Sequence, residues 1–78
     1  MSDWIKTDRA IYRREKISGV RIYKTIGARD EYRVEVLIEG NWCSYYIGKE
    51  VFFRDEAAVE AARTAAWEVY RRLCAELE

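Results

Sequence analysis

This chain of 78 residues lacks the side chain that most often acts as a general acid or base. It has no histidine, so the Ser–His and Cys–His pairs that activate nucleophiles cannot form. Two cysteines, Cys43 and Cys74, cannot make a usual four-ligand zinc site without histidine. The four glycines stand singly and do not form a phosphate-binding loop. We therefore expect no enzymatic activity, no metal and no cofactor.

Glu35 and Glu39 are the carboxylates whose spacing invites a catalytic interpretation. They face the same way on a predicted strand, but four strand residues place them about 13 Å apart. Paired carboxylates in glycoside hydrolysis stand roughly 5–9.5 Å apart. We interpret both as solubilising charges.

Charge is balanced overall and uneven along the chain. Lysine and arginine together number 14, as do aspartate and glutamate. Residues 1–29 carry a net charge of +5, from eight basic and three acidic side chains, and the remainder carries −5. This asymmetry indicates either an anionic partner for the N-terminal part or a solvated basic face.

Length and hydropathy argue against a multidomain protein, a membrane protein and a secreted protein. The length predicts a single domain over residues 1–78. No apolar run approaches the roughly 20 residues that span a bilayer, and no signal-peptide pattern is visible. Two cysteines are too few for a disulfide framework. We expect a soluble cytoplasmic protein with free thiols, no membrane association, and a monomeric or homodimeric state.

Short runs of alternating hydrophobicity between turn signals predict strands over residues 20–26, 32–39 and 42–47. In the second run, Tyr32, Val34 and Val36 share one face. In the third run we expect Cys43, Tyr45 and Ile47 to face the core, with Ser44 and Tyr46 outside. The residues around Gly40 predict a tight hairpin turn. The sheet therefore occupies residues 18–53.

A long helix is predicted over residues 55–77. Asp55 is a suitable N-cap, because its carboxylate can accept an orphan backbone N–H. An apolar stripe follows at 100° per residue and predicts the core-facing side. Its members are Ala58, Ala62, Ala65, Ala66, Val69, Leu73 and Leu77. The fold class is thus α+β, an antiparallel sheet of three strands packed on one long C-terminal helix.

Two parts of the chain leave alternatives open. Residues 1–17 lack a clear period, and we expect either an edge strand near residues 10–15, which would make a fourth strand, or a short helix. Trp67 lies opposite the apolar stripe between Arg63 and Arg71. This group is a candidate binding patch, unless Trp4 or Tyr12 folds over it.

The order of motifs resembles the DNA-binding domain of the ethylene-response-factor (Apetala-type) family, which also occurs in phage homing endonucleases. The resemblance covers residues 18–66 and implies a three-stranded sheet on one helix, with the outer sheet face in the DNA major groove. The matching residues are Gly19-Val20-Arg21, Tyr32-Arg33-Val34-Glu35-Val36, Tyr46-Ile47-Gly48, Phe53, Glu56-Ala57-Ala58, Ala61, Ala65 and Ala66.

The chain departs from that pattern where the family contacts DNA. Tyr23, Leu37 and Ser44 stand at positions that are usually basic, Tyr46 replaces a tryptophan, and two residues are inserted after Gly48. Phosphate neutralisation and guanidinium contacts supply much of the affinity for DNA. The predicted outer face has a mixed composition that is typical of protein recognition. Its members are Arg21, Tyr23, Arg33, Glu35, Leu37 and Tyr46.

Two functional hypotheses follow from these residues. In the first, the chain is a non-catalytic protein that binds and inhibits a larger nucleic-acid-processing complex. In its short length, its α+β fold class and its lack of an active site, it then resembles the small anti-CRISPR proteins of phages. In the second, it is a small sequence-specific DNA-binding protein or regulator of the Apetala-type fold.

Overall fold

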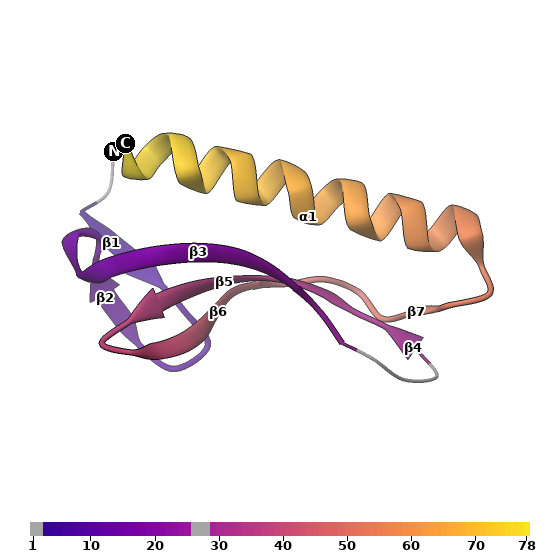
Figure 1. The fold of residues 1–78 in the computed structure, drawn as a ribbon, viewed down its shortest axis with the longest axis horizontal. Coiled ribbons are helices and arrows are strands. Elements are labelled where there is room, and N and C mark those ends of the chain that lie inside the picture. Colours follow the sequence, from indigo (N-terminus) through magenta and orange to yellow (C-terminus); the bar gives the residue numbers. More distant parts are fainter. Residues whose placement is uncertain (1–2, 26–28) are drawn as a thin grey trace.

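A three-stranded antiparallel sheet packs against one C-terminal helix (Figure 1). The computed structural model describes residues 3–25 and 29–78. Strands β3 (Ile17–Lys24), β5 (Tyr32–Ile38) and β6 (Asn41–Ile47) form the sheet in the order β3-β5-β6. Helix α1 (Glu56–Leu77) runs along one face of it. The predicted α+β fold class is confirmed.

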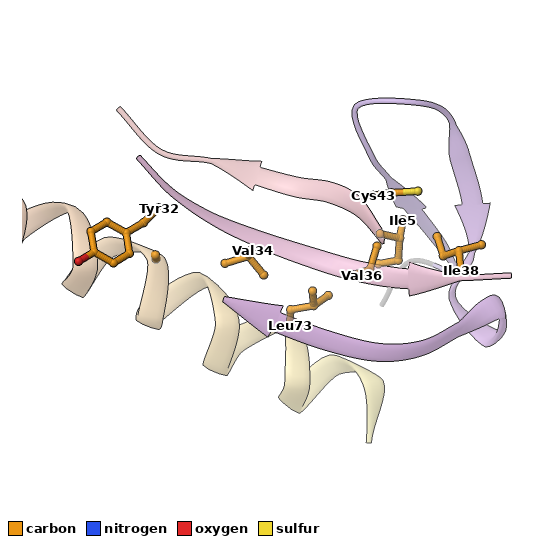
Figure 2. Close-up of a cluster of buried hydrophobic side chains, with 8 residues drawn as sticks. Ile5, Tyr32, Val34, Val36, Ile38, Cys43 and Leu73 are labelled. Carbon is orange, nitrogen blue, oxygen red and sulfur yellow. The ribbon is translucent and has the colours of Figure 1, made fainter. Parts of the chain in front are cut away.

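Strand β5 forms the centre of the core because both of its neighbours pair with it. Its alternating residues Val34 and Val36 are fully buried and Ile38 nearly so. From the helix, Ala66 and Leu73 complete the cluster (Figure 2). The alternation that predicted this strand therefore marks its helix-facing side.

The helix begins where its cap predicts. Asp55 accepts a hydrogen bond from the Ala58 backbone N–H through Oδ1 at 3.1 Å. Five further apolar side chains of the helix pack on the buried cluster, and three of them belong to the predicted stripe. The five are Val59, Ala62, Val69, Tyr70 and Leu77. At the other end, the Arg14 guanidinium donates to the Glu76 carbonyl at 2.9 Å, satisfying one of the helix's terminal acceptors.

A two-residue turn, Glu39-Gly40, joins β5 to β6. Both residues have positive φ, 51° and 80°, and the pair Ile38–Asn41 closes the hairpin. Positive φ at both central positions is the type I′ geometry, whose twist matches that of the flanking strands. The tight turn predicted over Glu39-Gly40-Asn41-Trp42 is present, but it lies one position earlier, because Asn41 and Trp42 already pair with β5.

Strand β6 contains a bulge that changes which residues face the core. Ser44 pairs with Glu35 and Tyr46 pairs with Val34, so Tyr45 is the extra residue on this strand. A bulge of one residue reverses the alternation beyond it. The prediction that Tyr46 faces outward and Ile47 inward is therefore wrong. Tyr46 shares the inner face with buried Val34, and Ile47 lies outside opposite Arg33.

The N-terminal segment forms its own hairpin. Strands β1 (Trp4–Lys6) and β2 (Ile11–Arg13) pair with each other, and a 3₁₀ turn, η1 (Arg14–Lys16), leads into β3. Of the two alternatives for this segment, an edge strand near residues 10–15 or a short helix, a strand is present as β2. It pairs with β1 and does not add a fourth strand to the central sheet. Ile5 points from this hairpin into the core, beside Cys43 and Val36 (Figure 2).

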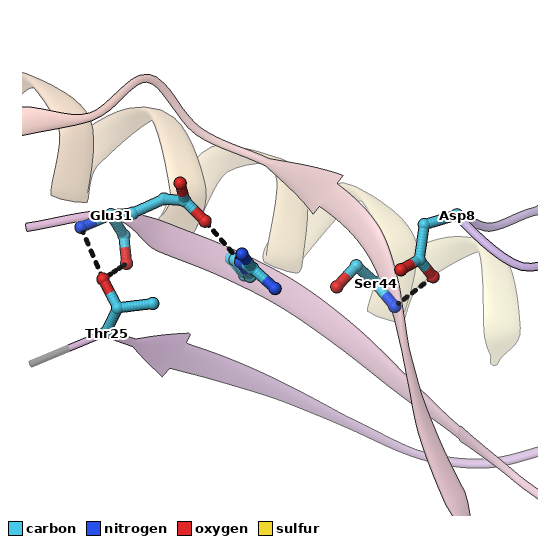
Figure 3. Close-up of polar contacts among 5 residues, drawn as sticks. Asp8, Thr25, Glu31 and Ser44 are labelled. Carbon is cyan, nitrogen blue, oxygen red and sulfur yellow. Dashed lines mark hydrogen bonds and ion pairs between the residues drawn. The ribbon is translucent and has the colours of Figure 1, made fainter.

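A second small ladder lies at the far end of the molecule. Strands β4 (Arg29–Asp30) and β7 (Val51–Phe52) pair there below the first turns of α1 (Figure 1). Nearby, the Thr25 backbone N–H donates to the Glu31 carbonyl at 3.0 Å. The Thr25 hydroxyl accepts from the Glu31 N–H and donates to the Glu31 carbonyl (Figure 3). Ile26, predicted to end the first strand, lies outside the described residues. The whole measures 39 × 21 × 15 Å.

Candidate binding surfaces

The sheet face that turns away from α1 carries three rows of side chains, one row per set of paired residues. Antiparallel partners point to the same side of a sheet, so the register defines each row. The rows are Gly19–Leu37–Trp42, Arg21–Glu35–Ser44 and Tyr23–Arg33–Ile47. We call these nine residues the outer sheet face.

Five of the six predicted outer-face residues lie there together. They are Arg21, Tyr23, Arg33, Glu35 and Leu37. The sixth, Tyr46, lies on the inner face because of the bulge at Tyr45. Trp42 and Ile47 were not predicted as members. The position of Trp42 opposite Leu37, one residue beyond a two-residue turn, could have identified it from the sequence, whereas the bulge that exposes Ile47 has no comparable signal.

Arg21 is held at the middle of this face by a carboxylate and two aromatic rings. Its Nε and Nη2 both lie 2.8 Å from Glu35 Oε1. Its guanidinium carbon lies 4.2 Å from the centre of the Trp42 ring and 5.2 Å from that of Tyr23. The Glu35 side chain is only 10% exposed. A charge-assisted pair with cation–π stacking fixes the arginine.

Arg33 is also neutralised within the chain. Its Nε donates to Glu31 Oε1 (Figure 3). This hydrogen bond raises the pKa of the Arg33 guanidinium above its ordinary value, with further contributions from the charges of Glu31, Glu35 and Asp8. Both arginines of the outer sheet face therefore have carboxylate partners, and the face has little net charge.

The apolar side chains of the outer sheet face remain accessible. Tyr23 is 43% exposed and Ile47 is 49% exposed, and they lie on either side of Arg33 in the same row. Leu37 is half-buried in the row with Trp42. Helix α1 covers the opposite face and leaves this one open. Its accessible side chains form a mixed aromatic and aliphatic surface around two arginines that are held by carboxylates.

The second predicted patch lies on the solvent side of α1. Trp67 is 44% exposed and makes an edge-on contact with Tyr70, with ring centres 5.3 Å apart. The Arg71 side chain donates back to the Trp67 carbonyl, and Arg63 pairs with Glu60. Of the residues considered as covers, Tyr12 packs against the core and Trp4 lies beside Arg13. Trp67 thus remains half open.

An aromatic pair at the β4–β7 end was not identified from the sequence. Phe52 and Phe53 are both more than half exposed. The Arg29 and Arg54 guanidiniums lie 5.0 Å and 5.4 Å from the Phe52 and Phe53 ring centres, respectively. From the sequence, these residues were interpreted only as large side chains at the point where the chain leaves the sheet. The two-residue ladder carries Phe52 and ends before Phe53.

Two concave surfaces of the described residues lie beside the N-terminal hairpin. A groove of about 550 Å³ follows the edge of β6 between hairpin β1–β2 and α1. A depression of about 660 Å³ lies where the hairpin meets the C-terminal end of α1, with Trp4, Arg13 and Leu77 in its wall. Its ion pair, Arg13 with Glu15 at 3.6 Å, is exposed and therefore weak.

Within the described residues no three cysteine, aspartate or glutamate side chains gather as a metal ligand set. Cys43 is buried and Cys74 half-buried, and they are not joined. A hydrogen bond with Cys74 raises the pKa of Tyr70 above its ordinary value. No helix in the described ranges combines the length and the apolar character that a membrane crossing needs.

Comparisons with protein-family models, with curated proteins and with solved structures found no match for the chain.

Proposed function

We propose that the protein is a non-catalytic binding module that recognises a protein partner through the outer sheet face. The observation that carries this proposal is the state of its arginines. Arg21 bonds Glu35 of the same face and Arg33 bonds Glu31 just before β5, while Tyr23 and Ile47 are exposed beside them. Tyrosine, tryptophan and arginine around aliphatic side chains are enriched at the centres of protein interfaces.

The partner that we propose is a larger nucleic-acid-processing complex, which the protein would inhibit in the manner of anti-CRISPR proteins. This step is supported by the charge distribution. The net charge of +5 over residues 1–29 and −5 over the rest suits a partner that presents both basic nucleic-acid channels and bound nucleic acid. Electrostatic complementarity of this kind speeds association more than it adds affinity.

The direct test is inhibition in a bacterial host. Strains that carry a characterised CRISPR system would express the chain and be challenged with a targeted phage, and plaque number would be counted. We expect the chain to restore plaques, and the variants Tyr23→Ala and Leu37→Ala to lose that effect because each removes an accessible side chain of the outer sheet face.

Trp67→Ala is the matched control, since Trp67 is comparably exposed but lies on α1. If Trp67→Ala abolishes the effect and the sheet variants retain it, the helix patch is the recognition surface. If the chain restores plaques in none of the CRISPR systems tested, the inhibitor proposal is wrong. The proposal that the chain is a binding module would then still be tested by its binding to a purified partner.

DNA binding is the second candidate, and the fold favours it. A three-stranded sheet on one helix with the outer face open is the arrangement that the Apetala-type resemblance implies. DNA binding is opposed by the carboxylates of Glu31 and Glu35, which already bond Arg33 and Arg21 and would repel phosphates. DNA would have to compete with these intramolecular bonds, which requires about 1 kcal/mol or more for each.

Titration with duplex DNA at increasing salt separates the two candidates. A protein that contacts several phosphates loses about 10³-fold or more in affinity between 50 and 200 mM salt. We expect weak binding with a shallow salt dependence. Tight binding with a steep slope, reduced by Arg21→Ala and Arg33→Ala together, would instead establish DNA as the ligand.

A further inference from the structure

The groove beside β6 is built from three separate elements. Hairpin β1–β2 contributes Lys6 and Asp8 to one wall, and α1 contributes Val69 and Arg72 to the other. Between them, the bulged segment of β6 supplies the side chains of residues 44–47. The groove is therefore mostly apolar at its base, with cations standing on its opposite walls.

These two cations have no partner within the described part of the chain. The side chains of Lys6 and Arg72 are exposed, and neither makes a hydrogen bond or an ion pair there. The arginines of the outer sheet face are paired, so the groove differs from that face in this respect. Asp8 is the carboxylate in the wall, and it accepts a hydrogen bond from the Ser44 backbone N–H at 3.0 Å (Figure 3).

The edge of β6 is occupied over only part of its length. Beside Ser44, the Asp8 backbone N–H donates to the Ser44 carbonyl at 2.9 Å, and the Asp8 side chain accepts from the Ser44 amide. The hairpin tip therefore takes the place that a neighbouring strand would fill. An incoming chain cannot pair with Ser44.

Ile47, three residues further along, has an open edge. The Gly48 N–H donates to the Tyr32 carbonyl at 2.9 Å, which marks Tyr32 and Gly48 as a hydrogen-bonded pair. Such pairs alternate with pairs whose backbone groups point away from each other. The Arg33–Ile47 pair is of the second kind, so the Ile47 N–H and carbonyl point outward along the groove.

We propose that this groove binds an extended acidic peptide segment of a partner protein. The segment lies beside β6, exchanges backbone hydrogen bonds with Ile47, and places its carboxylates near Lys6 and Arg72. Its apolar side chains rest on Tyr45 and Val69. Backbone pairing supplies affinity in this mode of recognition, and the flanking side chains supply specificity. The groove shares Ser44 and Ile47 with the outer sheet face but does not include Tyr23 or Leu37, so Tyr23→Ala and Leu37→Ala test the proposed function without altering the groove.

Fluorescence anisotropy with the full-length protein tests the proposal directly. The probe is a short labelled peptide of alternating glutamate and valine, and the comparison is a lysine–valine peptide of equal length. We expect the acidic peptide to bind and the basic one to fail. Lys6→Gln and Arg72→Gln should each weaken binding about two- to fivefold, as expected for exposed ion pairs, and more when combined.

Arg71→Gln is the matched control, because Arg71 neighbours Arg72 but does not line the groove. It should leave the affinity unchanged. A second control is the acidic peptide with N-methyl groups on alternate residues. These groups replace the backbone N–H donors that strand pairing needs and block access to the neighbouring carbonyl acceptors. This peptide should lose binding although its charge is the same.

Several results would overturn the proposal. Equal binding of the acidic and basic peptides would do so, as would equal binding of the N-methylated peptide or insensitivity to both glutamine substitutions. Tighter binding of a single-stranded oligonucleotide that depends on Lys6 and Arg72 would assign the groove to nucleic acid. A dimer in sedimentation that dissociates in Arg72→Gln would assign it to a second copy of the chain.

Discussion

Arg21 lies between a carboxylate and two aromatic rings, and this arrangement decides what the middle of the outer sheet face can do. An arginine bonded twice to Glu35 and stacked on Trp42 is rigid. A rigid side chain loses little conformational entropy when a partner covers it. Glu35 engages donors at Nε and Nη2, and its negative charge would repel a phosphate that approached the remaining N–H groups. The residue therefore favours packing against a protein surface.

Glu35→Ala tests how strongly this group stabilises the fold. The change removes the hydrogen bond and the ion pair with Arg21 and leaves space at a nearly buried position. We expect a loss of about 1–3 kcal/mol in the free energy of unfolding, measured by urea denaturation. Glu39→Ala is the control, because Glu39 is exposed in the turn, and should change it by less than about 0.5 kcal/mol. Equal losses in the two variants would mean that the pair contributes nothing.

Glycine is required at Gly48 by close approach and at Gly40 by backbone conformation. A Cβ on Gly48 would stand 2.7 Å from the Tyr32 carbonyl oxygen, whereas Gly40 has open space around it and a φ of 80°. The first position is restricted by its neighbour and the second by its own backbone. The Gly48 restriction keeps β6 close to β5 just beside the open edge at Ile47.

Among the elements, the N-terminal hairpin has a structural role beyond its own two strands. Its tip closes the edge of β6 at Ser44, and Ile5 fills the core behind it. An unpaired edge strand is a site for unwanted pairing with other chains. The hairpin therefore both protects the sheet and forms one wall of the groove.

Asp8→Ala should weaken this closure. It leaves the buried Ser44 amide without its acceptor, and we expect a loss of about 1–2 kcal/mol in unfolding free energy together with faster hydrogen exchange at the Ser44 amide. Asp8→Asn keeps an acceptor oxygen and should lose less. Arg9→Ala changes the neighbouring tip residue, whose side chain makes no contact of this kind, and should behave as wild type. An unaltered Ser44 exchange rate in Asp8→Ala would show that the carboxylate does not hold the edge.

The elements that the sequence predicted well are those whose pattern depends on local periodicity. Residues 32–38 alternate without interruption and form β5, and Asp55 followed by alanines forms a capped helix. The outer-face positions on β3 and β5 followed from the same alternation. The element whose orientation was wrong, the end of β6, depends on an extra residue that alternation alone cannot reveal.

The N-terminal segment was ambiguous for a related reason. Its strands have three residues each, too few for a period, and they pair through a turn that Thr7 closes by bonding Ala10. The groove could not be predicted either, because its walls come from three elements far apart in the chain. Only the tertiary arrangement brings Lys6 and Arg72 to the same groove.

On the scale of the whole molecule, the core is concentrated toward one end. Of the buried helix residues, Ala66 lies at the middle of α1 and Leu73 in its second half, whereas the first turns face the short β4–β7 ladder. The radius of gyration of 13.1 Å exceeds the roughly 11.5 Å typical of a compact chain of this length. The exposed Phe52 and Phe53 lie at the thinner end.

Hydrogen exchange should report this gradient. We expect amides of residues 68–74 to exchange at least about tenfold more slowly than those of residues 60–64, because opening the first half of the helix exposes little buried surface. Mass spectrometry or NMR of the native protein measures both ranges in one experiment. Uniform protection along α1 would show that the β4–β7 end is as tightly held as the rest.

The bulge in β6 has a simple consequence at the level of the gene. The extra residue, Tyr45, is followed by an identical one, Tyr46, so deleting either codon encodes the same shorter protein. In that protein a tyrosine still faces Val34 and Ile47 still faces Arg33, because the remaining pairs keep their partners. Duplication of one tyrosine codon in a regular strand would produce the present arrangement. The sheet can therefore gain or lose its groove-lining bulge in a single in-frame step, without any other residue changing the side on which it lies.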